Sequence, residues 1–169
     1  MAGQPEVWLR GPVPDVPAPL QPLAHALLWV MEDLERLVAP LTMDELWARP
    51  GGVASIGFHV RHLSGALDRL FTYARAEALS EQQKAALARE KDESLGDGAA
   101  QLLIAARAAV EAALGQLRRT DPDALDEPRE VGRAKLPSTV RGLLAHGAEH
   151  AVRHAGQIAT TARIVRATA

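Results

Sequence analysis

The sequence has no cysteine, and this absence narrows the chemistry open to the protein. Without cysteine there is no catalytic thiol, no thiolate metal site and no disulfide. No apolar stretch approaches the roughly 20 residues that a membrane helix needs. The first residues, "MAGQPEVWLRGPVPDVPAPLQP", have no basic segment followed by an apolar run, so we expect no secretory signal. Together these absences predict a cytoplasmic protein that does not enter the membrane.

The net charge is small, and aromatic residues are scarce. The net charge of -2 provides no overall attraction to nucleic acid or to an anionic membrane, so we expect neither as a partner. Aromatic residues make up only 4% of the chain, and no stretch alternates apolar and polar residues for long. The composition therefore predicts few strands and an all-α fold.

Proline is concentrated at the start of the chain. Five of the eleven prolines fall within the first 19 residues. Proline fixes φ and removes a backbone donor, so residues 1–18 are expected to form an extended arm. We expect Trp8 and Leu9 to pack this arm onto a single helical domain, residues 19–169.

Four stretches of the remaining chain carry apolar residues at alternating three- and four-residue spacing, as in helices that bury one face. They begin near Leu20, after Ser55, before Leu103 and after Pro137, where Ser138 is the expected N-cap. Between them, "TMDEL" and "SEQQ" have the spacing of capping boxes that open short connecting helices. The segment "TDPDALDEPREVGRAKLP" is expected to be a loop. The predicted fold is an up-and-down four-helix bundle.

Histidine is the informative residue type, and all six histidines fall on three of the four predicted long helices. In the last helix, His150 and His154 occupy positions of the predicted core-facing stripe, which continues through Gln157 and Ile164. His146 lies at its edge. A buried imidazole needs a partner for each ring nitrogen, and a shared metal ion meets this need for two histidines four residues apart.

Two further predicted helices supply the other histidines. His59 lies near the core-facing stripe of the second long helix and His62 lies on its flank, and the periodicity does not decide between them. His25 lies on the first long helix. Three imidazoles favour zinc, nickel, iron(II) or copper over magnesium or calcium, and they leave a coordination position open for water.

The segment "HGAEH", residues 146–150, also matches the H-x-x-E-H pattern of inverted zinc peptidases. Those enzymes take an acidic ligand from further along the chain, and no aspartate or glutamate follows Glu149. Glu149 also lies about 100° around the helix from His150. We therefore do not expect a peptidase.

Taken together, the chain resembles the DinB/YfiT-like family of metal-binding four-helix bundles, over about residues 20–164. The stretches "SIGFHVRHLSGALDRL", "LLAHGAEHAVRHAGQI" and "LTMDELWARPGG" are similar to family segments in the same order. The resemblance implies that His62, His150 and His154 hold a divalent metal, nickel or zinc. His25, His59 and His146 remain candidates for extra ligands or acid/base groups, and Gln157 for a side chain that supports the ligands.

Characterised relatives include transferases and isomerases that use low-molecular-weight bacterial thiols, so the resemblance implies such a thiol as a possible cofactor. Three hypotheses remain open: a metal-dependent transferase or hydrolase acting on a small molecule, a non-catalytic metal-binding or stress-response protein, and a helical scaffold. Alanine-rich helix faces make a homodimer a reasonable expectation. A basic cluster before and within the last helix is expected to be solvated, or else to guide an anionic substrate; it comprises Arg129, Arg133, Lys135 and Arg141.

Overall fold

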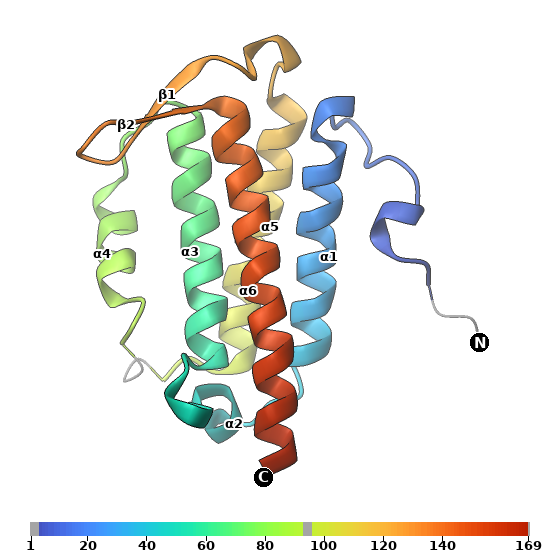
Figure 1. Cartoon of the computed structure of the whole chain (residues 1–169), viewed down its shortest axis with the longest axis vertical. Coiled ribbons are helices and arrows are strands. Elements are labelled where there is room, and N and C mark those ends of the chain that lie inside the picture. Colours follow the sequence, from blue (N-terminus) through green and yellow to red (C-terminus); the bar gives the residue numbers. More distant parts are fainter. Residues whose placement is uncertain (1–3, 93–95, 169) are drawn as a thin grey trace.

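The computed structural model describes residues 4–92 and 96–168, and it is mostly α-helical as predicted (Figure 1). The long helices are α1 (Gln21–Val38), α3 (Ile56–Ala74), α5 (Ala99–Arg119) and α6 (Val140–Thr168). The short helices are α2 (Met43–Trp47) and α4 (Glu81–Arg89). Strands β1 (Pro128–Val131) and β2 (Leu136–Thr139) form a small antiparallel pair. None of the described helices is long and apolar enough to cross a membrane.

The four long helices lie side by side around one apolar core (Figure 1). Helices α6 and α5 each pack against both α3 and α1. The largest side chains with almost no exposed surface come from all four helices and their connections; they include Leu27, Leu34, Ile56, Leu63, Leu67, Leu117, Leu144 and Ile158. This core fixes the relative positions of α3 and α6, which carry most of the histidines.

The predicted up-and-down alternation is wrong at one connection. Helices α3 and α5 run in the same direction, from the end of the molecule with α2 to the end with the β hairpin (Figure 1). Consistent with this, the Trp47 indole N–H donates to the Asp97 carbonyl just before α5, at 3.1 Å. The long connection after α3 contains α4, and it brings the chain back to its starting end.

Side-chain caps begin the helices where the sequence predicts, with one exception. Thr42 with Glu45 and Ser80 with Gln83 form capping boxes for α2 and α4. Ser55 accepts from the Phe58 N–H at the start of α3.

The predicted Ser138 cap is wrong, because residues 136–139 pair with residues 128–131 in the hairpin. Thr139 Oγ1 accepts from the Gly142 N–H instead, at 3.0 Å. Strands of four residues are too short to show a periodic pattern of apolar residues, so the sequence predicted a loop where this hairpin forms.

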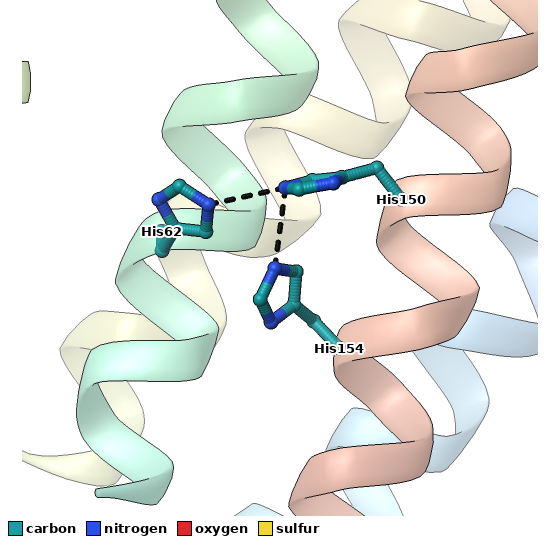
Figure 2. A group of neighbouring side chains, drawn as sticks. All are labelled: His62, His150 and His154. Carbon is teal, nitrogen blue, oxygen red and sulfur yellow. Dashed lines mark hydrogen bonds between the residues drawn. The ribbon is translucent and has the colours of Figure 1, made fainter. Parts of the chain in front are cut away.

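The buried face of α6 is broader than the predicted stripe, of which Val140, Leu143, His154 and Thr161 are buried. A second row of buried residues beside it follows Leu144, Ala148, Ala151, Ala155, Ile158, Ala162 and Val165. Gln157 is exposed, and Ile164 is 44% exposed. His150 and His154 therefore lie beside the centre of the buried face, on the flank that meets α3 (Figure 2).

The N-terminal arm packs through valines rather than through its large side chains. Val7, Val13 and Val16 are buried, whereas Trp8 is 60% and Leu9 is 57% exposed, so the predicted roles of Trp8 and Leu9 are wrong. The Gln21 side chain hydrogen-bonds to the Val13 N–H and to the Val13 and Val16 carbonyls. The arm is not extended throughout, because 3-10 turns form at Val7–Leu9 and Ala18–Leu20.

Candidate metal centre

Close packing of α3 against α6 brings the histidines of the two helices together. Gly147 makes this approach possible, because a Cβ atom there would lie 2.9 Å from the ring of Phe71 on α3. On α6, the four-residue spacing of His150 and His154 places both rings on one flank. His62 extends toward them from α3 (Figure 2).

Three ring nitrogens converge at this contact. His150 Nε2 lies 3.1 Å from His62 Nε2 and 3.2 Å from His154 Nε2 (Figure 2). One nitrogen from each of the three rings lies within 4.8 Å of the other two. This is the only such group of three histidine or acidic side chains in residues 4–92 and 96–168.

The other nitrogens of these rings face different partners. His62 Nδ1 lies 2.7 Å from Glu90 Oε2, and His154 Nδ1 lies 3.0 Å from His59 Nδ1. His150 Nδ1 is buried and has no hydrogen-bond partner among the described residues. An ionised carboxylate only accepts hydrogen bonds, so the contact with Glu90 is a hydrogen bond only when His62 carries a proton on Nδ1.

Three imidazoles of the histidine cluster, which comprises His59, His62, His150 and His154, have a lowered pKa. Burial, reinforced by the charges that His150, His62 and His59 carry when protonated, lowers the pKa of His154 to about 4. Burial also lowers the pKa of His59 and of His150. Metal ions bind the neutral form of imidazole, so near pH 7 these rings need not lose a proton to become ligands.

The convergent nitrogens fit a metal ion in chemistry and in spacing. A proton on His150 Nε2 can be donated to only one of its two neighbouring nitrogens, whereas a cation between the rings can be bound by all three. Two nitrogens that bind one zinc ion at about 2.0–2.1 Å, at a tetrahedral angle, are roughly 3.3 Å apart. The observed separations of 3.1 and 3.2 Å are close to this value.

Comparison with protein families agrees with this geometry. The sequence profile of the DinB superfamily matches residues 26–158, a segment that contains all three converging histidines. The chain belongs to the DinB superfamily. A comparison with curated proteins found no match.

In this DinB-superfamily chain, the other three histidines have separate environments. His59 is 7% exposed and contacts His154 from behind rather than joining the three converging nitrogens. His146 is exposed at the edge of the cluster and lies 3.2 Å from Glu149. His25 Nε2 lies 2.9 Å from the Gly11 carbonyl, at the contact between α1 and the N-terminal arm.

Glu149, the glutamate of the H-x-x-E-H match, lies on the surface of α6. Glu149 is exposed and pairs with Arg153 and His146 along the surface of α6. It belongs to no group of metal-ligating side chains among the described residues.

The basic cluster is largely neutralised by its own neighbours. Arg129 donates to the Ala74 carbonyl at 2.8 Å, and Lys135 and Arg141 pair with Glu130 and Asp126. These contacts account for three of the four basic residues without an anionic substrate.

Two residues of the site were not predicted from the sequence. Glu90 follows α4, in a polar segment that predicted only a solvated helix, yet it is 5% exposed and hydrogen-bonds to His62. Phe58 stacks on the His62 ring, with the two planes 7° apart and the centroids 5.4 Å apart. Its position four residues before His62 on α3 is the one signal that could have found it.

Proposed function

We propose that His62, His150 and His154 bind a divalent transition metal, and that the protein is a metal-dependent enzyme acting on a small molecule by thiol transfer or hydrolysis. The convergence of three histidine nitrogens between α3 and α6 is the observation that carries this proposal. Membership of the DinB superfamily also supports it. The long helices, arranged as a four-helix bundle with one crossover connection, provide the rigid scaffold.

Imidazole ligands suit zinc, nickel, iron(II) or copper, and the family resemblance favours zinc or nickel among these. When bound by three protein ligands, such a metal keeps a position for an exchangeable ligand and lowers the pKa of a water or thiol there. A low-molecular-weight thiol is the co-substrate that the family resemblance implies, and the absence of cysteine from the chain is no obstacle to it, since the metal would bind the thiol of the co-substrate.

The side chains around the ligands have complementary tasks. Phe58 covers one face of the His62 ring and keeps water from it. His146 is exposed, and its ring centroid lies 5.5 Å from that of His150, so it is the candidate proton carrier at the rim. His59 hydrogen-bonds to His154 on the side away from the converging nitrogens.

Metal analysis of the protein, purified without a histidine tag, tests the binding proposal. We expect close to one equivalent of zinc or nickel after reconstitution, and none in a His154→Ala variant. His146→Ala and His25→Ala are matched controls, because each removes a histidine outside the cluster, and both should retain the metal. A wild-type protein that takes up no transition metal refutes the proposal.

A screen with bacterial thiols and electrophilic acceptors tests the catalytic part. Turnover that disappears in His154→Ala and persists in His25→Ala supports an enzyme. If a fully loaded protein turns over no acceptor and hydrolyses no ester, the non-catalytic metal-binding alternative is favoured.

A further inference from the structure

We infer that Glu90 is a positioning residue of the metal centre: its carboxylate fixes the proton of His62 on Nδ1 and thereby presents Nε2 to the metal. This inference rests on the proposed metal function and extends it to a residue outside α3 and α6. It also makes α4, the helix that Glu90 follows, part of the centre.

The surroundings of Glu90 are unusual for a carboxylate. Its side chain is 7% exposed, and each oxygen has one close cationic or polar partner. Oε2 lies 2.7 Å from His62 Nδ1 and Oε1 lies 2.5 Å from Arg69 Nη1. Burying a carboxylate is costly unless it is paired, and here the guanidinium compensates its charge while the imidazole N–H satisfies the second oxygen.

The structure reserves space for this pair. Gly65 on α3 lies directly beneath it, because a Cβ atom there would be 2.6 Å from Glu90 Oε1 and 2.7 Å from Arg69 Nη1. Any larger residue would push the carboxylate or the guanidinium away. The glycine therefore keeps Glu90 within reach of His62.

Polar contacts hold Glu90 at the end of α4. The helix itself buries none of its residues. Arg61 on α3 donates to the carbonyls of Glu90 and Asp92, at 3.3 and 2.6 Å. A cavity of about 390 Å³ lies alongside, lined by Gly65, Ala86 and Glu90 among others. The chain thus places Glu90 by fixing the residues after α4 rather than by packing the helix tightly.

A carboxylate suits the position beside His62 Nδ1 because it only accepts hydrogen bonds. It has no proton to donate, so His62 must donate from Nδ1 and must leave Nε2 unprotonated. A carboxylate behind a histidine ligand commonly sets the tautomer and orientation of the ring, and its loss costs about 10–100-fold in metal affinity.

A Glu90→Gln variant is the sharpest probe, because it preserves shape and removes one acceptor. The amide offers one oxygen and one NH₂ group to two partners, Arg69 and His62. If the oxygen faces Arg69, the NH₂ group faces His62. His62 Nδ1 must then accept a hydrogen bond, so the ring proton moves to Nε2. If the oxygen faces His62, the NH₂ group confronts the guanidinium. Replacing Arg69 with Met in the same chain removes this conflict and frees the amide oxygen for His62.

The test combines Zn²⁺ titration against a chelating dye with ¹⁵N NMR of the imidazoles in metal-free protein. We expect His62 to carry its proton on Nδ1 in the wild type. We expect Zn²⁺ affinity to fall about 10–100-fold in Glu90→Gln and to recover in the double variant Arg69→Met/Glu90→Gln.

Either of two results overturns the inference: Zn²⁺ affinity in Glu90→Gln equal to that of the wild type, or a wild-type His62 protonated on Nε2. A double variant as weak as Glu90→Gln also counts against it, because a general loss of structure, and not the proton conflict, would then explain the single variant. If the wild type binds no Zn²⁺, the metal proposal fails, and the NMR measurement alone still decides whether Glu90 sets the His62 tautomer.

Discussion

At the scale of single residues, the cluster depends on imidazoles that stay neutral while close together. His154 is 8% exposed and has histidines on both sides, at His59 Nδ1 and His150 Nε2. Protonating it would place a charge in a site from which most water is excluded. The lowered pKa of His154 keeps its ring neutral and able to bind a metal ion near pH 7, and it also makes the metal-free protein sensitive to acid.

We predict that the metal-free protein loses stability as the pH falls from about 6.5 toward 4. In the unfolded chain, His154 titrates near its ordinary pKa of about 6.5, whereas in the folded protein its pKa is about 4. Between these two pH values the unfolded state binds more protons than the folded state, so acid favours unfolding. The contribution of His154 to the free energy of unfolding therefore keeps its full value above pH 6.5 and falls below it, by up to roughly 3 kcal/mol.

Urea unfolding of chelator-treated protein at pH 7.5 and pH 5 measures this decline. A His154→Gln variant should show a shallower decline, and the exposed His146→Gln control should keep the wild-type slope. A His154→Gln protein with the full wild-type slope would show that other groups cause the acid sensitivity.

Residues of the cluster differed in how far the sequence could identify them. Periodicity and spacing selected His150 and His154, because both lie on one helix. The choice of His62 over His59 came only from the family resemblance, since both are close to the same helix face. Glu90 could not be predicted, because its contact with His62 joins positions 28 residues apart and depends on how the chain returns after α4.

At the scale of helices, the centre depends on how closely α3 and α6 approach. Gly147 has Phe71 and Leu67 of α3 directly opposite its Cα atom. Both side chains are buried in the core, so neither can move far without opening a cavity.

We predict that Gly147→Ala destabilises the protein by about 1–3 kcal/mol through overpacking and weakens metal binding by separating the two helices. Gly156→Ala is the matched control on α6, because a Cβ atom there meets nothing within 4 Å. That change should be neutral or stabilise by up to about 1 kcal/mol. Thermal unfolding and Zn²⁺ titration of both variants give the comparison, and equal behaviour would contradict the close-contact argument.

The sequence predicted where helices begin better than it predicted which helix faces are buried, because caps depend on neighbouring residues alone. The caps at Thr42, Ser55 and Ser80 need only nearby residues, and all three are in place. The buried face of α6 is broader than the predicted stripe, since alanines and glycines on several faces give a weak hydrophobic period. The β hairpin formed by pairing that no local pattern indicates.

At the scale of the whole molecule, the N-terminal arm and the histidine cluster are separate. The arm packs on α1 and is held by Gln21, whereas the cluster lies between α3 and α6. The direction of α5 was mispredicted because a helix pattern carries no information on whether a long connection turns back or crosses over.

We predict that Gln21→Ala costs about 1–3 kcal/mol of stability, because it leaves the Val13 N–H and two carbonyls of the arm without their partner. Metal stoichiometry should remain that of the wild type. Chemical unfolding and metal analysis of the same preparation measure both quantities. Loss of the metal in this variant would show that the arm and the cluster are coupled.

The most direct test of the central proposal is a crystal structure of the zinc-loaded protein with anomalous diffraction at the zinc edge. We expect one strong peak between α3 and α6, at about 2.0–2.1 Å from a nitrogen of each of His62, His150 and His154. A peak bound instead by His146 or His25, or the absence of any peak in a crystal grown with zinc, would contradict it.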